Sequence, residues 1–176
     1  MAFRRFGQVV PPATTKVKVE MNEVQFLRFR ENNKNSFVTV DLNNYSAVAI
    51  VSQSAAIIAH IAARPNTSHM NNPQEGDQNV QAKMDEFAAF FNQQRNFFSP
   101  GQRTWVISAL YAGDIAMSDH KAIIERNIKR MELSYANVAY LELKRELPLS
   151  AAQGTIFIDA RKESPIVYVG NNRINL

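Results

Sequence analysis

Cysteine is absent from this 176-residue chain. Its absence excludes disulfides, thiolate metal ligands and every mechanism with a cysteine nucleophile, because each of these needs a sulfur atom. A chain of this length can bury a core of sufficient size without such cross-links. The histidines at His60, His69 and His120 are not spaced as ligands of one metal ion. We therefore expect no metal centre and no cofactor.

Long apolar runs are missing as well. No stretch approaches the roughly 20 consecutive apolar residues that a membrane-spanning helix requires. The opening residues, MAFRRFGQVVPPATTK, lack the continuous apolar core of a signal peptide. We therefore expect a soluble, cytoplasmic protein that makes no membrane contact.

Charged residues are sparse, at 20% of the chain with a net charge of +4. Basic residues concentrate only at 3–6, 126–130 and 144–145, which is a weak footprint for nucleic acid. Asparagine and glutamine, in contrast, account for 27 residues. Amides can be buried without the desolvation penalty of a charge. An amide-rich surface is therefore either simply solvated or suited to contacts with another protein.

The first 15 residues differ from the rest of the chain. Residues 1–15 contain Gly7, Pro11 and Pro12 and have no hydrophobic periodicity, which predicts an extended arm. The strand and helix patterns begin after it, so we expect residues 16–176 to form one α+β domain.

Apolar alternation predicts most of the strands. Residues 16–30 alternate with one slip in phase, which predicts a strand with a bend or bulge near Asn22. Two nearly continuous apolar runs, 46–51 and 55–63, predict adjacent strands that are buried on both faces. Further strands are expected at 37–42, 103–112, 137–144, 155–160 and 166–169.

Two segments have helical periodicity instead. The first helix is expected over 78–98, and the second from an N-cap at Ser118 to about Leu133. The expected buried face of the first consists of Val80, Met84, Phe87, Phe91 and Phe98. About seven or eight strands with only two main helices predict an α+β fold, in which the helices pack on a largely antiparallel sheet or sandwich.

A candidate site centres on His60, which stands in the second apolar run. A lone histidine in such a run is more often a hydrogen-bonded core residue than a catalyst. A serine hydroxyl becomes a nucleophile only when a base within hydrogen-bond reach takes its proton. If the two apolar runs are antiparallel neighbours, His60 could activate Ser46 in this way, with Thr39 or Tyr45 in support. One hypothesis is therefore a hydrolase or amidase-like enzyme.

The same region carries a resemblance. NNYSAVAIV at 43–51, followed by AAIIAHIAARP at 55–65, resembles the core of the chemotaxis deamidase CheD and its relatives in the cysteine-dependent glutamine deamidase superfamily. In that family a cysteine thiolate attacks a glutamine side-chain amide, a histidine is its base, and an upstream threonine helps to orient them. The resemblance implies that His60 matches the histidine and Thr39 the threonine. The cysteine position falls on Ser46 or, with one residue of slip, on Tyr45.

This scaffold lacks the nucleophile that the resemblance requires. A serine hydroxyl is far weaker than a thiolate near neutral pH. We therefore interpret the region as a retired enzyme site, and we expect the His60 imidazole to be capped by backbone or packed by neighbouring side chains.

Our first hypothesis follows: a non-catalytic protein that forms a homo-oligomer or higher-order assembly. Its arm would make contacts between subunits through Phe3, Arg4, Arg5 and Phe6. A further alternative is RNA or DNA binding through Arg4, Arg5, Lys129 and Arg130, with Phe3 or Phe6 stacking on bases. The scattered distribution of the other basic residues argues against it.

Overall fold

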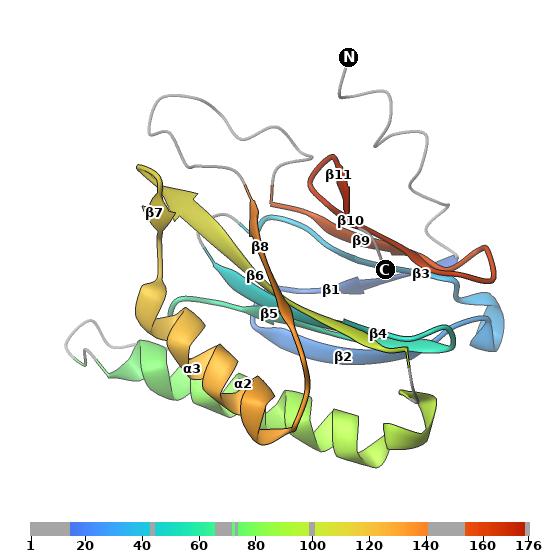
Figure 1. Ribbon diagram of the computed structural model, residues 1–176, viewed down its shortest axis with the longest axis horizontal. Helices are drawn as coiled ribbons and strands as arrows, with labels where there is room; N and C mark the ends of the chain where they lie inside the picture. Colours follow the sequence, from blue (N-terminus) through green and yellow to red (C-terminus); the bar gives the residue numbers. More distant parts are fainter. Residues whose placement is uncertain are drawn as a thin grey trace.

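The fold is α+β and has three layers (Figure 1). The computed structural model describes residues 15–42, 45–65, 72, 74–98, 101–140 and 154–174. Over these residues, two helices cover one face of a central sheet, and a second, outer sheet covers its other face. The predicted fold class is thereby confirmed.

Eleven strands make up the two sheets in the described part of the chain. The outer sheet has the order β1-β3-β9-β10-β11 and contains β1 (Lys16–Val19), β3 (Ser36–Thr39), β9 (Ile156–Asp159), β10 (Ile166–Val169) and β11 (Asn172–Ile174). The central sheet has the order β2-β5-β4-β6-β7, with β8 also paired to β6. Its strands are β2 (Glu23–Arg28), β4 (Ser46–Val51), β5 (Ala55–Ile61), β6 (Arg103–Tyr111), β7 (Asp114–Ile115) and β8 (Ala136–Tyr140).

Most strand pairs are antiparallel, as the sequence predicted. Among the pairs described, β1 with β3 and β6 with β8 are parallel. The second of these pairs encloses a crossover helix, which is the usual way for a chain to return to a parallel neighbour.

Both faces of the central sheet are buried. Every residue of β4 and β5 is inaccessible to solvent or nearly so. In β4, Ala47 and Ala49 pack in the core between the sheets, whereas Val48 and Ile50 pack beneath the helices. Because successive side chains of a strand point to opposite faces, a strand covered on both sides needs apolar residues throughout. The prediction of two adjacent, doubly buried strands is confirmed, and they pair antiparallel.

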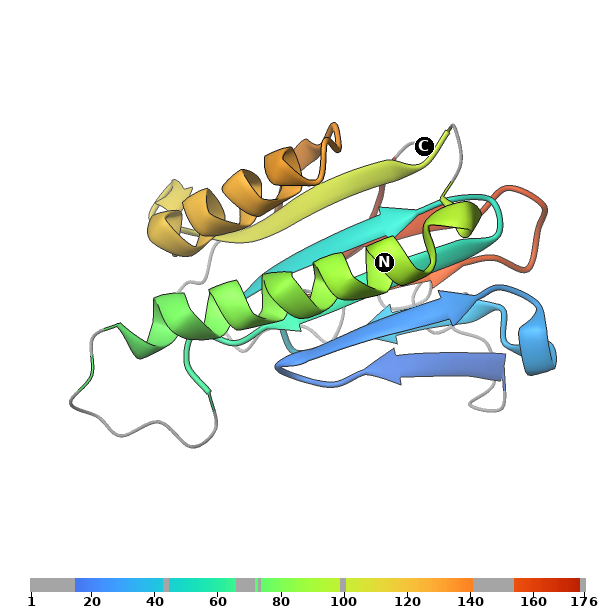
Figure 2. The same cartoon turned by 90° about the horizontal axis from the view of Figure 1, so that it is seen from below.

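The helical layer consists of α2 (Glu75–Gln93) and α3 (Ser118–Arg130), which lie over the central sheet (Figure 2). The predicted apolar stripe of the first helix is confirmed, because all five of its residues are buried. The α-helix ends earlier than predicted, and a short 3-10 helix, η3 (Arg95–Phe97), follows it. Ser118 is the first helical residue of α3 rather than its N-cap, and no side chain caps that end.

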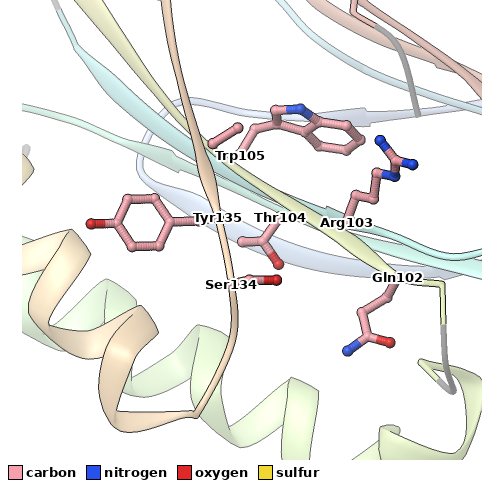
Figure 3. Close-up of a pocket in the computed structure, with 7 residues that line it drawn as sticks. Gln102, Arg103, Thr104, Trp105, Ser134 and Tyr135 are labelled. Carbon is pink, nitrogen blue, oxygen red and sulfur yellow. The ribbon is translucent and has the colours of Figure 1, made fainter.

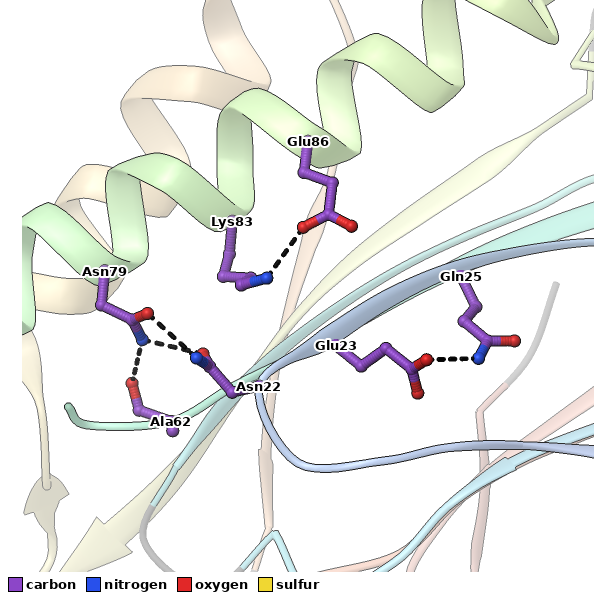
Figure 4. A network of polar contacts seen from close by, with 7 residues as sticks. All are labelled: Asn22, Glu23, Gln25, Ala62, Asn79, Lys83 and Glu86. Carbon is purple, nitrogen blue, oxygen red and sulfur yellow. Dashed lines mark hydrogen bonds and ion pairs between the residues drawn. The ribbon is translucent and has the colours of Figure 1, made fainter. Parts of the chain in front are cut away.

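Two reciprocal amide pairs join α2 to its neighbours. Asn22 and Asn79 each donate to the other at 3.1 and 2.8 Å, and Asn79 also donates to the Ala62 carbonyl at 3.0 Å (Figure 4). Gln81 and Asn127 form a second pair at 3.0 and 3.1 Å, which links α2 to α3. Asn79 and Asn127 are buried, so part of the amide content stabilises the interior rather than the surface.

The predicted single bent strand at 16–30 is wrong. This segment forms β1 and β2, which belong to different sheets. Asn22 has a φ of 61° in the turn between them, a left-handed conformation that asparagine tolerates better than most residues. The alternation continues on both sides of the turn, so its pattern alone resembles one strand with a bulge.

Candidate functional site

Thr39 and His60 meet between the two sheets. Thr39 ends β3 in the outer sheet, His60 lies near the end of β5 in the central sheet, and the Thr39 Oγ1 to His60 Nδ1 distance is 2.8 Å. The Thr39 hydroxyl donates its hydrogen to the Val19 carbonyl at 2.9 Å. Because a hydroxyl has a single hydrogen, it must accept the second bond, so His60 carries its proton on Nδ1.

Burial decides the charge of His60. The side chain is 1% exposed, and desolvation lowers its pKa to about 4, although Asp41 and Glu20 favour the charged form. The imidazole is therefore neutral at neutral pH. Its Nε2 is unprotonated and has no hydrogen-bond partner among the described residues.

The Tyr45 ring lies beside the imidazole. Its ring centroid lies 6.0 Å from that of His60, with the planes tilted by 49°. The backbone here is fixed on both sides: the Tyr45 amide donates to the Leu42 carbonyl at 2.6 Å, and its own carbonyl accepts from the Tyr140 hydroxyl at 2.7 Å. The His60 ring is thus in contact with the side chains of Thr39 and Tyr45.

Ser46 is on the other face of the central sheet from His60. In the antiparallel β4–β5 pair, Ala47 is opposite His60 and Ser46 is opposite Ile61. Directly opposed residues share a face and successive residues alternate, so Ser46 faces the helices while His60 faces the outer sheet. The strands are antiparallel neighbours, but Ala47 rather than Ser46 is opposite His60. The Ser46 hydroxyl and its supposed base therefore lie on opposite faces of the sheet. The structure does not bring Ser46 and His60 together.

The same alternation distinguishes the two possible cysteine positions. Tyr45 precedes Ser46 and lies on the side of the sheet that contains His60. Of the two residues, Tyr45 occupies the position that a nucleophile served by His60 would need. It contributes a phenol ring there, and no thiol is available anywhere in the chain.

A second histidine, His120, lies where the two helices approach each other. It is buried at the start of α3, and its Nε2 lies 3.7 Å from Asp77 Oδ1 near the start of α2. Burial lowers its pKa, against the influence of Asp77 and Asp119. A Cβ atom on Gly76 would lie 3.0 Å from His120 Nε2 and 2.8 Å from the Ala63 carbonyl oxygen. A glycine in the first turn of a helix is the sequence signal for this close packing.

A surface hollow of about 340 Å³ lies away from His60, where β6 and β8 begin (Figure 3). In Figure 3, Thr104 and Gln102 extend to one side of β6, and Trp105 and Arg103 to the other. The Thr104 hydroxyl is buried and has no hydrogen-bond partner among the described residues. The lining residues are Gln102, Arg103, Thr104, Trp105, Ser134, Tyr135 and Ala136. They include no carboxylate and no histidine, which are the side chains that most often act as general bases.

The remaining predicted residues fall elsewhere. Phe3, Arg4, Arg5 and Phe6 lie outside the described residues. Lys129 and Arg130 form the last turn of α3, where cations stabilise the helix dipole. Over the described residues, no three metal-ligating side chains are grouped together, and neither α2 nor α3 is long and apolar enough to cross a membrane.

No protein-family model matches the chain, and no curated protein matches it significantly.

Proposed function

We propose that this chain is a cytoplasmic, non-catalytic structural protein that associates with copies of itself, on a scaffold that resembles the CheD deamidases. The closed environment of His60 carries the proposal. A general base needs a pKa near the working pH and an open approach to its substrate. His60 instead has a pKa of about 4 and is 1% exposed between two sheets.

The contacts of His60 support the scaffold. The resemblance implies a threonine beside the histidine, and Thr39 lies within hydrogen-bond distance of it. It also implies a nucleophile on the adjacent strand, and Tyr45 lies at that place. A site that keeps the threonine and histidine but has a tyrosine at the nucleophile position is consistent with lost catalysis.

Composition and topology support self-association. Amides are abundant and charge is low, which reduces the desolvation penalty when surfaces meet. Over the described residues both sheets are also open, so each ends in outer strands that pair on one side only.

An activated ester tests the absence of catalysis. After incubation with the ester, we expect mass spectrometry to detect no acyl group on Ser46 or Tyr45 whose formation depends on His60. The matched control is His60→Ala, checked for folding by circular dichroism. An acyl group on Ser46 in the wild type that disappears in folded His60→Ala would overturn the proposal in favour of a hydrolase.

A further inference from the structure

The outer edge of β8 differs from the other sheet edges. β8 pairs with β6 on one side, and no described strand pairs with Ala136 to Ala139 on the other. Figure 1 shows β8 in front of β6. Ala136, Asn137 and Ala139 are exposed. An edge strand of this kind presents unpaired backbone N–H and C=O groups to solvent.

Charge protects every other outer strand of the described sheets. Proteins commonly prevent strands from pairing between molecules by placing charged residues on their edges. The charged residues are Lys16 and Lys18 in β1, Glu23 and Arg28 in β2, Asp114 in β7, and Arg173 in β11. β8 has the sequence ANVAY and carries none.

Side chains at both ends hold β8 in place. Asn137 donates to Glu125 of α3 at 3.0 Å. The Tyr140 hydroxyl donates to the Tyr45 carbonyl at 2.7 Å, and burial raises the pKa of Tyr140, which keeps that hydroxyl protonated. A strand fixed in its extended form loses little conformational entropy when another strand pairs with it.

We propose that the outer edge of β8 pairs antiparallel with β8 of a second copy, which joins two central sheets into one. This inference rests on the proposed self-association and names its surface. A two-fold axis between identical strands makes them antiparallel. Because ANVAY is uncharged, it can oppose itself without like-charge repulsion, whereas β1 would place lysines near lysines.

Sedimentation velocity of the full chain tests this surface. The variants are Ala139→Lys and Ala139→Glu, with Ala89→Lys as the matched control, because Ala89 is an exposed alanine on α2. We expect each charge at position 139 to weaken association by about tenfold, since two-fold symmetry places the two like charges on the same face of the strand pair and close together. Ala89→Lys should associate like the wild type.

An equimolar mixture of the two Ala139 variants is the decisive measurement. In a β8 pair the opposite charges lie close together, so the mixture should recover association. Unchanged association of both variants, or a loss that the mixture does not recover, would overturn β8 pairing while self-association itself stands. A wild type that remains monomeric would overturn both proposals. Circular dichroism establishes that each variant is folded, and the pair Ala136→Lys and Ala136→Glu replaces the Ala139 pair if either Ala139 variant unfolds, because Ala136 is also exposed.

Discussion

Replacing His60 by asparagine should flatten the loss of stability that this protein undergoes on acidification. The unfolded chain binds a proton at its histidine near pH 6.5, whereas the folded protein does so only near pH 4 because His60 is buried. Between these values the unfolded state holds the extra proton. Lowering the pH through this window therefore favours unfolding.

The size of the effect follows from the two pKa values. Each unit of difference corresponds to about 1.4 kcal/mol, so the His60 contribution falls by about 3 kcal/mol between neutral pH and about pH 4. Asparagine has no ionisable group in this range, and its amide can still donate to Thr39. The stability advantage of the wild type over His60→Asn should therefore shrink by about 3 kcal/mol on acidification.

Urea unfolding at a series of pH values measures this difference. Comparison with His60→Asn removes the contributions of other titrating groups to the pH dependence of stability. One of these groups is His120, whose pKa is also lowered by burial. His120→Asn is the matched control, and its unfolding free energy should still fall on acidification by the full amount that His60 contributes. If the wild-type and His60→Asn stability curves run parallel with pH, His60 is not a buried neutral imidazole and the reasoning fails.

Two further substitutions test the packing around the site. Thr39→Val should destabilise the fold by about 2 kcal/mol in urea unfolding, because the Val19 carbonyl and the His60 Nδ1–H lose their shared partner. Thr39→Ser keeps the hydroxyl and should recover most of the lost stability. Equal stability of the valine and serine variants would contradict the role of the hydroxyl. Gly76→Ala should lower the stability by about 1–3 kcal/mol, because its Cβ would lie 2.8 Å from the Ala63 carbonyl oxygen. Gln78→Ala, at an exposed position of the same helix, should leave the melting temperature nearly unchanged, and a similar loss in both variants would count against the close approach.

The features that sequence predicted best are those with a strong, local hydrophobic pattern. The doubly buried strands β4 and β5 require apolar residues at every position, and α2 requires a stripe, so both patterns are visible in the chain. The two-residue strand β7 and three-residue strand β11 are too short to give such a pattern. Their pairing depends on the strands beside them.

The geometry of the candidate site depends on strand register, which the hydrophobic pattern does not reveal when both faces of the strands are buried. His60 and Ser46 were correctly placed on neighbouring strands, but their faces depend on whether Ser46 or Ala47 is opposite His60. The Thr39–His60 bond joins two different sheets. The sequence offered Thr39 as a partner of His60, from its place on a preceding strand and from the resemblance, but it did not show that the contact would join two sheets.

Sedimentation velocity of the full chain at micromolar concentrations tests the proposed role most directly, beside a chain that lacks residues 1–15. We expect the full chain to sediment as species larger than a monomer, in proportions that rise with concentration, and the shortened chain to shift toward the monomer. If both chains sediment as the same monomer throughout this range, the protein does not assemble and the proposed function is wrong.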